Sequence, residues 1–209
     1  MKSLVILISG RGSNMRAILD AELPAKIAAV ISNNPKAEGL AIAETRGIET
    51  SSVDHKKFPN RETFDSELAE VIDAYSPDLV VLAGFMRILS NWFVSHYRGR
   101  LINIHPSLLP AFPGLNTHER ALATGVKIHG ASVHFVTNQL DHGPIIIQAA
   151  VPVLPDDTAE SLAARVLEQE HRIYPQAIRW FLAGKLKLKD NAVVVDRRVK
   201  ARPRAMVIS

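Results

Sequence analysis

The sequence predicts an α/β fold, in which a mostly parallel central sheet carries helices on both faces. Short apolar runs rich in β-branched residues alternate along the chain with segments of helical periodicity. A glycine-rich turn, Gly10–Asn14, follows the first of these runs and precedes a helical segment. At 209 residues with 47% hydrophobic side chains, the chain can bury one full core. We therefore expect a single domain over residues 1–190, followed by a basic C-terminal tail over residues 191–209.

Six segments have the length and composition of strands. Four of them are short and apolar, as strands buried on both faces of a parallel sheet are. Two more lie in the second half of the chain, joined by a connection rich in turn-forming residues. The expected strands are Leu4–Ile8, Ile27–Ile31, Leu79–Ala83, Leu101–Ile104, Ala131–Val136 and Ile145–Val151.

Periodicity predicts two helices against this sheet. Apolar side chains recur at three- and four-residue steps between Phe64 and Tyr75, which indicates one apolar stripe covering the sheet. A later helix is expected to begin at Asp157, because Glu160 completes a pattern like a capping box, and to run towards Gln169.

The C-terminal part of the chain combines helix-ending signals with most of the positive charge. Pro175 is expected to break or kink the helix that precedes it, and Gly184 to end the helical segment. Lys185–Ser209 holds eight Lys or Arg and two Asp, a local balance of +6, so the rest of the chain stands at −2 against the net +4. Such a terminal charge run is typical of a solvated tail, and no nucleic-acid partner is expected.

Composition narrows the possible classes of protein further. The chain has no cysteine, which excludes disulfides, thiolate metal sites and a cysteine nucleophile and fits a reducing, cytoplasmic location. No apolar run approaches the roughly 20 residues of a membrane span, so no membrane association is expected.

The glycine turn is a candidate anion site. Backbone N–H groups of Gly12, Ser13 and Asn14 at the start of a helix could hold a phosphate. A dinucleotide is disfavoured, because Met15 stands where the third glycine of G-x-G-x-x-G belongs. An ordinary strand-to-helix turn with no ligand explains the same residues equally well.

Asn103, His105 and Asp141 are the candidate catalytic residues. Residues two apart on a strand project to the same face, so Asn103 and His105 should point the same way. Pro106 should end the strand and leave both side chains at its rim, where open parallel sheets place their chemistry. An amide, an imidazole and a carboxylate suit the transfer of an acyl carbon between two nitrogens without a covalent enzyme intermediate.

Each group has a defined role in that chemistry. Asn103 can donate a hydrogen bond to the oxyanion that develops on the acyl group. His105 can face the same oxygen or relay a proton from the attacking amine to the leaving nitrogen. Asp141 would orient the imidazole and favour its protonated form.

Other polar residues are weaker candidates. Ser107 lacks the G-x-S-x-G setting of a nucleophile, and no H-E-x-x-H or comparable metal-ligand spacing occurs in the chain. His134, on the strand before the Asp141 loop, is expected in the core or behind the catalytic residues.

Four motifs together resemble the folate-dependent phosphoribosylglycinamide formyltransferase family, over Leu4 to about Asn191. They are Ile8–Asn14, Leu82–Leu89, Asn103–Pro110, and Ser132–Val136 leading to Asp141–Pro144. The resemblance implies a Rossmann-like formyltransferase fold. It also implies transfer of a formyl group from N10-formyltetrahydrofolate to the amine of glycinamide ribonucleotide in purine biosynthesis, without a metal and by a monomer or homodimer.

The resemblance also implies roles for individual residues. It makes Asn103, His105 and Asp141 the catalytic trio. Gly12, Ser13 and Asn14 would hold the substrate phosphate, and Glu170 would contact the substrate ribose. The residues implied for the folate pocket are Arg61, Met86, Arg87, Ile88 and Leu89, together with Asn103.

Two positions depart from the family pattern. His142 stands where glycine is frequent, and Asn116 stands where histidine is common. His142 adds a bulky, titratable neighbour to Asp141, so it could change the shape and pH response of that loop.

Three other functions remain open at this stage. A formyltetrahydrofolate hydrolase and a methionyl-tRNA formyltransferase would share the same core, but we expect the first to carry an extra N-terminal domain and the second a large C-terminal one. The third is a non-catalytic α/β module that binds a phosphorylated metabolite through Gly12–Asn14, and it would need neither Asn103 nor Asp141.

Overall fold

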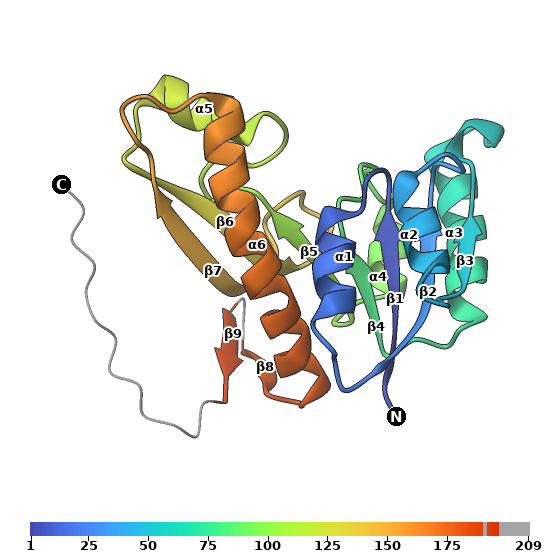
Figure 1. Ribbon diagram of the computed structural model, residues 1–209. Helices are drawn as coiled ribbons and strands as arrows, with labels where there is room; N and C mark the ends of the chain where they lie inside the picture. Colours follow the sequence, from blue (N-terminus) through green and yellow to red (C-terminus); the bar gives the residue numbers. More distant parts are fainter. Residues whose placement is uncertain (190–191, 197–209) are drawn as a thin grey trace.

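A seven-stranded mixed sheet forms the centre of the protein (Figure 1). The structure is a computed structural model, which describes residues 1–189 and 192–196. The strands lie in the order β3-β2-β1-β4-β5-β6-β7. The first five are parallel, whereas β6 and β7 are antiparallel to their neighbours. Their bounds are β1 Ser3–Ile8, β2 Lys26–Ser32, β3 Thr50–Ser52, β4 Leu79–Leu82, β5 Leu101–His105, β6 Ile128–Phe135 and β7 Ile145–Pro152. The expected mostly parallel sheet is confirmed.

Helices cover both faces of the sheet, as predicted. One apolar cluster lies between the sheet and the helices α1, α2, α5 and α6. The other lies between the opposite face and α3 and α4. The helix bounds are α1 Ser13–Asp20, α2 Glu38–Glu44, α3 Arg61–Asp73, α4 Asn91–His96, α5 Thr117–Thr124 and α6 Ala159–Leu182, with a short 3-10 turn, η1, at His55–Lys57.

The long helix α6 differs from its prediction at two points. Its first residue is Ala159, two residues after the expected start at Asp157, because Thr158 caps it and forms the capping box with Ser161, while Asp157 accepts a hydrogen bond from the Ser161 hydroxyl. It also continues through Pro175 to Leu182, so of the expected break or kink at this proline, the break does not occur. The apolar stripe of α6 is buried along its whole length, and that burial outweighs the loss of one backbone hydrogen bond.

Tyr174 fixes α6 to the sheet next to that proline. Its buried hydroxyl lies 2.8 Å from the carbonyl oxygen of Leu82, the last residue of β4, and 3.2 Å from that of Ile102 in β5. It can donate a hydrogen bond to either oxygen. The helix lies beside α1 across the same face of the sheet (Figure 1). Gly184, with a φ of 66°, ends this segment as expected.

A small hairpin follows α6. Strand β8 (Leu186–Lys189) pairs antiparallel with β9 (Ala192–Val195), and Leu186 and Val193 pack against the main core. The expected boundary between domain and tail, after residue 190, thus falls between these two strands. Residues 190–191 and 197–209, most of the expected tail, lie outside the described residues.

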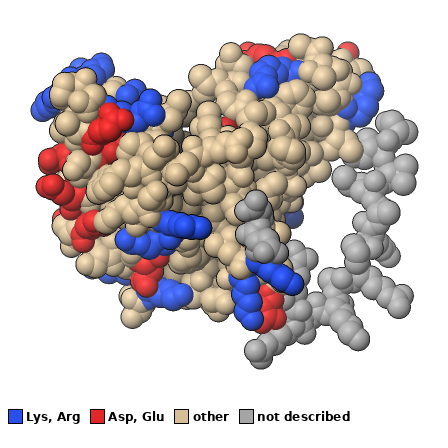
Figure 2. Space-filling view, turned by 180° about the vertical axis from the view of Figure 1, so that it is seen from behind, with Lys and Arg blue, Asp and Glu red and all other residues tan. Residues whose placement is uncertain are grey.

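Charge is dispersed over the face of the molecule drawn in Figure 2. Lys and Arg side chains form separate small groups, interspersed with Asp and Glu and with uncharged surface (Figure 2). No helix within residues 1–189 and 192–196 has the length and apolar character of a membrane span.

Candidate active site

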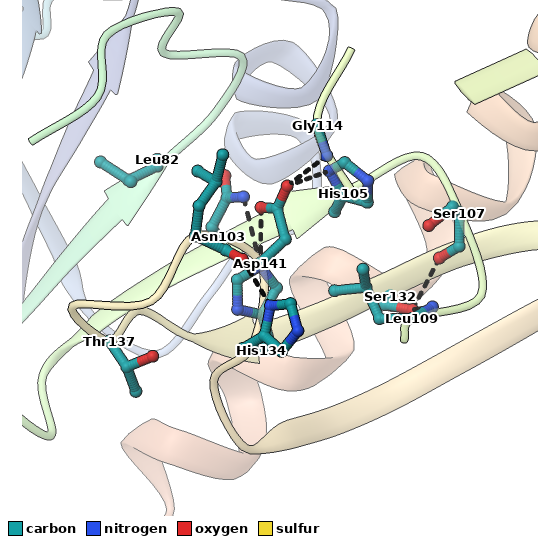
Figure 3. A network of polar contacts seen from close by, with 12 residues as sticks. Leu82, Asn103, His105, Ser107, Leu109, Gly114, Ser132, His134, Thr137 and Asp141 are labelled. Carbon is teal, nitrogen blue, oxygen red and sulfur yellow. Dashed lines mark hydrogen bonds and ion pairs between the residues drawn. The ribbon is translucent and has the colours of Figure 1, made fainter. Parts of the chain in front are cut away.

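The carboxyl ends of β1, β4 and β5 meet at one edge of the sheet, and the predicted site residues gather there. Asn103 and His105 lie two residues apart near the end of β5, so both project to the same side. Asp141 reaches them from the loop between β6 and β7 (Figure 3). The structure therefore brings together three residues that the sequence separates by up to 38 positions.

His105 is held between two oxygen atoms. Only 6% of the residue is exposed. Its Nε2 donates to the carbonyl oxygen of Phe112 at 2.9 Å, and its Nδ1 lies 3.5 Å from Oδ2 of Asp141. Because a carbonyl oxygen only accepts, Nε2 carries a proton in this arrangement. Each ring nitrogen thus faces an oxygen that can accept a hydrogen bond.

Asp141 is fixed by its backbone as well as by its neighbours. Its φ is 54°, a left-handed conformation that is uncommon outside glycine but tolerated by Asp. The carboxylate accepts a hydrogen bond from the Gly114 backbone at 2.8 Å, and 9% of the residue is exposed. Gly143 allows the loop to return, because a Cβ there would lie 1.7 Å from the carbonyl oxygen of Phe135.

His134 also belongs to this cluster, whereas the sequence predicted it in the core or behind the catalytic residues. The antiparallel register pairs it directly with Asn103, and Nδ2 of Asn103 lies 3.3 Å from Nε2 of His134 (Figure 3). The same Nε2 lies 3.9 Å from Oδ1 of Asp141. Burial lowers the pKa of His134, although its hydrogen bond to the Phe135 carbonyl and the charge of Asp141 oppose this.

The neutral state of His134 determines how Asn103 is oriented. Nδ1 of His134 donates to the Phe135 carbonyl at 2.9 Å, so in the neutral ring Nε2 accepts from the Asn103 amide. An amide nitrogen has two hydrogens, and one of them therefore remains available to a ligand. No local pattern in the sequence marks His134, because its place opposite Asn103 depends on the pairing of β6 with β5.

The loop after β5 is held by buried hydrogen bonds. The Ser132 hydroxyl accepts from the Leu109 backbone at 3.0 Å and donates to the Ser107 carbonyl at 2.7 Å (Figure 3). The Ser107 hydroxyl donates to the Ala111 carbonyl at 2.6 Å. Ser107 is fully buried and committed to the loop, which agrees with its rejection as a nucleophile.

The glycine turn lies at the end of β1 and opens α1. Gly12 has a φ of 72°, and a Cβ on it would lie 3.2 Å from the Cα of Gly39, so the turn requires a residue without a side chain. No side chain caps α1, which leaves the N–H groups at its start to other acceptors. Ser13 is exposed at this terminus.

Asn14 and Glu170 join the glycine turn to α6. Nδ2 of Asn14 donates to Oε2 of Glu170 at 2.6 Å, across 156 residues of sequence. Both residues are more than nine-tenths buried. Burial raises the pKa of the Glu170 carboxyl, and the hydrogen bond from Asn14 opposes that rise. The structure thus unites the residues expected at the phosphate and the ribose.

The predicted folate residues occupy the segment between β4 and α4. Met86, Arg87 and Ile88 are exposed, whereas Leu89 packs against the core. The Met86 backbone N–H donates to the Ser9 hydroxyl at 2.7 Å, which ties this segment to the end of β1. Arg61 is exposed at the first residue of α3, outside the segment between β4 and α4.

The two departures from the family pattern have different structural settings. His142 is exposed, and its Nδ1 lies 2.7 Å from the Leu140 carbonyl oxygen, so the ring is held by its own loop. Asn116 has a φ of 55° immediately before α5, a conformation that asparagine adopts readily. Within residues 1–189 and 192–196, no three His, Asp or Glu side chains are grouped to hold a metal ion.

Comparison with known proteins decides the family. A family model described as formyl transferase matches residues 1–178. A phosphoribosylglycinamide formyltransferase of Escherichia coli K12 is 54% identical over 198 residues, which cover 93% of each chain. The chain belongs to the phosphoribosylglycinamide formyltransferase family. The resemblance stated from the sequence is therefore confirmed.

Solved structures place the chain on the same formyltransferase fold. A phosphoribosylglycinamide formyltransferase of Coxiella burnetii is 52% identical, with a TM-score of 0.89 and 93% of each chain covered. A formyltetrahydrofolate deformylase of Pseudomonas syringae is 32% identical, with a TM-score of 0.86, and the match covers 93% of this chain but 65% of the deformylase. In the human trifunctional purine biosynthetic protein adenosine-3, the match is 46% identical and covers 19% of that protein.

Proposed function

We propose that this formyltransferase transfers the formyl group of N10-formyltetrahydrofolate to the amine of glycinamide ribonucleotide in de novo purine biosynthesis. The observation that carries the proposal is the convergence of Asn103, His105 and Asp141 at one end of the sheet, with the His105 ring 3.5 Å from the Asp141 carboxylate. The family membership supports the same reaction.

The transfer proceeds by direct attack. The amine nitrogen forms a bond to the formyl carbon, and negative charge moves onto the formyl oxygen while the nitrogen becomes positive. A proton then passes from that nitrogen to N10 of the folate. The bond between the carbon and N10 breaks, the carbonyl re-forms, and the products are formylglycinamide ribonucleotide and tetrahydrofolate. No acyl-enzyme intermediate is required.

Asn103 and His105 supply the electrostatic help in this proposal. The Asn103 N–H that is not engaged by His134 donates to the oxyanion. To face the same oxygen or carry the proton between the two nitrogens, the His105 Nε2 exchanges the Phe112 carbonyl for the substrate, while Nδ1 stays beside Asp141. Burial of His105 and Asp141 strengthens the interactions of these two residues, because little water competes with them.

Different segments beside the trio receive the acceptor and the co-substrate. Gly12, Ser13 and Asn14 hold the phosphate of the nucleotide at the start of α1, and Glu170 receives its ribose. The folate pocket is formed by Met86, Arg87, Ile88 and Leu89 with Asn103, and Arg61 adds positive charge nearby. A metal-free reaction and a cytoplasmic location remain predictions, as does the choice between monomer and homodimer.

One assay tests the proposed function. Purified protein is mixed with N10-formyltetrahydrofolate, with and without glycinamide ribonucleotide, and the deformylated folate is followed by absorbance. We expect its release only when the nucleotide is present, with the same rate after addition of EDTA. Release without the nucleotide would indicate instead a hydrolase, for which the likeness to the Pseudomonas syringae deformylase provides a specific alternative.

A further inference from the structure

A groove of about 510 Å³ lies between α1 and α6, which pack side by side on one face of the sheet (Figure 1). The residues that line it recur at three- and four-residue steps, so each helix contributes one face. They include Ser13, Arg16 and Asp20 of α1 and His171, Arg172 and Arg179 of α6. Ser13 is the first residue of α1 and belongs to the glycine turn. One end of the groove therefore opens where the phosphate of the acceptor is expected.

Positive charge dominates this groove. Three guanidinium groups line it, and Asp20 supplies the only carboxylate among its lining residues. That carboxylate pairs with Arg46, outside the lining, at 2.5 Å. None of the three lining arginines forms a salt bridge with any residue of 1–189 or 192–196. Burial lowers the pKa of His171, so this ring is uncharged near pH 7. The groove thus carries positive charge that the protein does not compensate.

The three arginines are held to different degrees. Arg179 donates from Nη2 to the carbonyl oxygen of Ala21, which fixes its guanidinium at the far end of the groove. Arg172 makes one long hydrogen bond, 3.3 Å from Nη1 to Oε1 of Gln169 in the preceding turn of α6. Arg16 is exposed, and its side chain forms no hydrogen bond to the part of the chain that the structure describes. Arg16 and Arg172 are therefore able to meet an anion.

Both of these arginines lie close to the glycine turn. Arg16 follows Ser13 by three residues, roughly one helical turn or about 5 Å along α1. Arg172 follows Glu170 by two residues, and residues two apart point to different sides of a helix. Glu170 is buried against Asn14, whereas Arg172 is exposed beside it. The two charges therefore flank the turn from outside, at a range where attraction persists because the Debye length is about 10 Å at 0.1 M salt.

We propose that Arg16 and Arg172 form an entry site, which draws the phosphate of the nucleotide acceptor along the groove to the glycine turn. The inference rests on the proposed function, because it takes the acceptor to be a phosphate ester bound at that turn. A concave surface of one charge raises the local concentration and the association rate of a ligand of opposite charge. The two arginines act on the approach of the acceptor and take no part in the transfer of the formyl group.

The test measures kcat/KM for glycinamide ribonucleotide at saturating N10-formyltetrahydrofolate, over a range of ionic strength from about 0.02 M to about 0.5 M. For the wild type we expect kcat/KM to fall as salt is added. The double variant R16Q/R172Q should have a kcat/KM about fivefold lower than the wild type at the lowest ionic strength. At the highest ionic strength the two values should converge, because salt screens the attraction that the variant lacks.

Two matched variants complete the experiment. R16K/R172K keeps both charges and should keep the wild-type kcat/KM and its dependence on salt. K26Q/R98Q removes two exposed charges at the opposite edge of the sheet, where β2 begins and β5 is about to begin, and should also behave as the wild type does.

Several results would overturn the inference. They are an unchanged kcat/KM in R16Q/R172Q at low salt, a loss in that variant that persists at high salt, or a loss as large in R16K/R172K. An equal loss in K26Q/R98Q would mean that net charge alone, and not this groove, attracts the acceptor. Absence of nucleotide-dependent turnover in the wild type would instead contradict the proposed function.

Discussion

The catalytic cluster and the folate segment lie at the same edge of the sheet but are built in opposite ways. In this cluster His105, His134 and Asp141 are buried, Asn103 is half-buried, and the loop that carries Asp141 is fixed by Gly143. Between Met86 and Ile88 the side chains are exposed, and one backbone hydrogen bond to Ser9 ties the segment to β1. The difference follows from the two tasks: charge stabilisation needs fixed groups away from water, whereas a long co-substrate needs an open surface.

The largest effect is expected where the cluster is broken directly. His105→Ala removes the group that faces the developing charge, and we expect kcat to fall by about 10²- to 10⁴-fold. Binding of the nucleotide, measured by calorimetry, should change little because the phosphate residues lie on α1. A variant that keeps more than a tenth of wild-type turnover would contradict a chemical role for this ring.

The burial of the catalytic end should also appear as a dependence of stability on pH. His129, on β6 and 1% exposed, has a pKa lowered to about 4 by burial and, to a lesser degree, by His118. Its folded pKa lies below the unfolded value of 6.5, so the unfolded chain binds more protons between these values and stability falls as pH falls. The full loss is about 3 kcal/mol, taken from that shift.

Urea unfolding at pH 7.5 and pH 4.5 measures this contribution. We expect His129→Phe to lose less stability between the two pH values than the wild type does. His142→Gln is the matched control, because His142 is exposed and should leave the difference unchanged. If His129→Phe shows the same pH dependence as the wild type, the burial of His129 does not govern acid stability.

A third prediction concerns the link between the glycine turn and α6. Asn14→Ala leaves the buried Glu170 carboxylate without its donor, which should cost about 1–3 kcal/mol of unfolding free energy. The pKa of Glu170 should rise further, because the lost hydrogen bond opposes the effect of burial. Ser13→Ala, at an exposed neighbour, should leave the unfolding free energy within about 0.5 kcal/mol. Equal losses in both variants would show that the link is not specific.

The smallest effect is expected in the folate segment. Ser9→Ala removes the acceptor of the Met86 N–H, and we expect KM for the folate to rise about threefold with kcat nearly unchanged. The KM for the nucleotide serves as the control and should be the same as in the wild type. A fall in kcat as large as that of His105→Ala would mean that the two regions are not independent.

Local patterns in the sequence predicted what depends on one segment at a time. The apolar runs gave six of the seven strands of the main sheet but not the polar β3, and alternation along β5 placed Asn103 beside His105. What depends on distant pairing was not predicted: His134 joins the cluster only because β6 runs antiparallel to β5 in a particular register. The break at Pro175 was predicted from a local rule, but the buried stripe of α6 outweighs it. The left-handed backbone at Asp141 was not predicted either, because aspartate tolerates this conformation but does not require it.

The pairing of His105 with Asp141 is tested most directly by Asp141→Asn. This variant keeps the size of the side chain and removes the charge that faces the imidazole, 3.5 Å away. Single-turnover kinetics should show a rate of formyl transfer about 10²- to 10⁴-fold lower, by analogy with other acid–base pairs, while the Kd of the nucleotide stays within about threefold. Equal losses in rate and in nucleotide binding would contradict the account, because Asp141 would then support the fold and not the reaction.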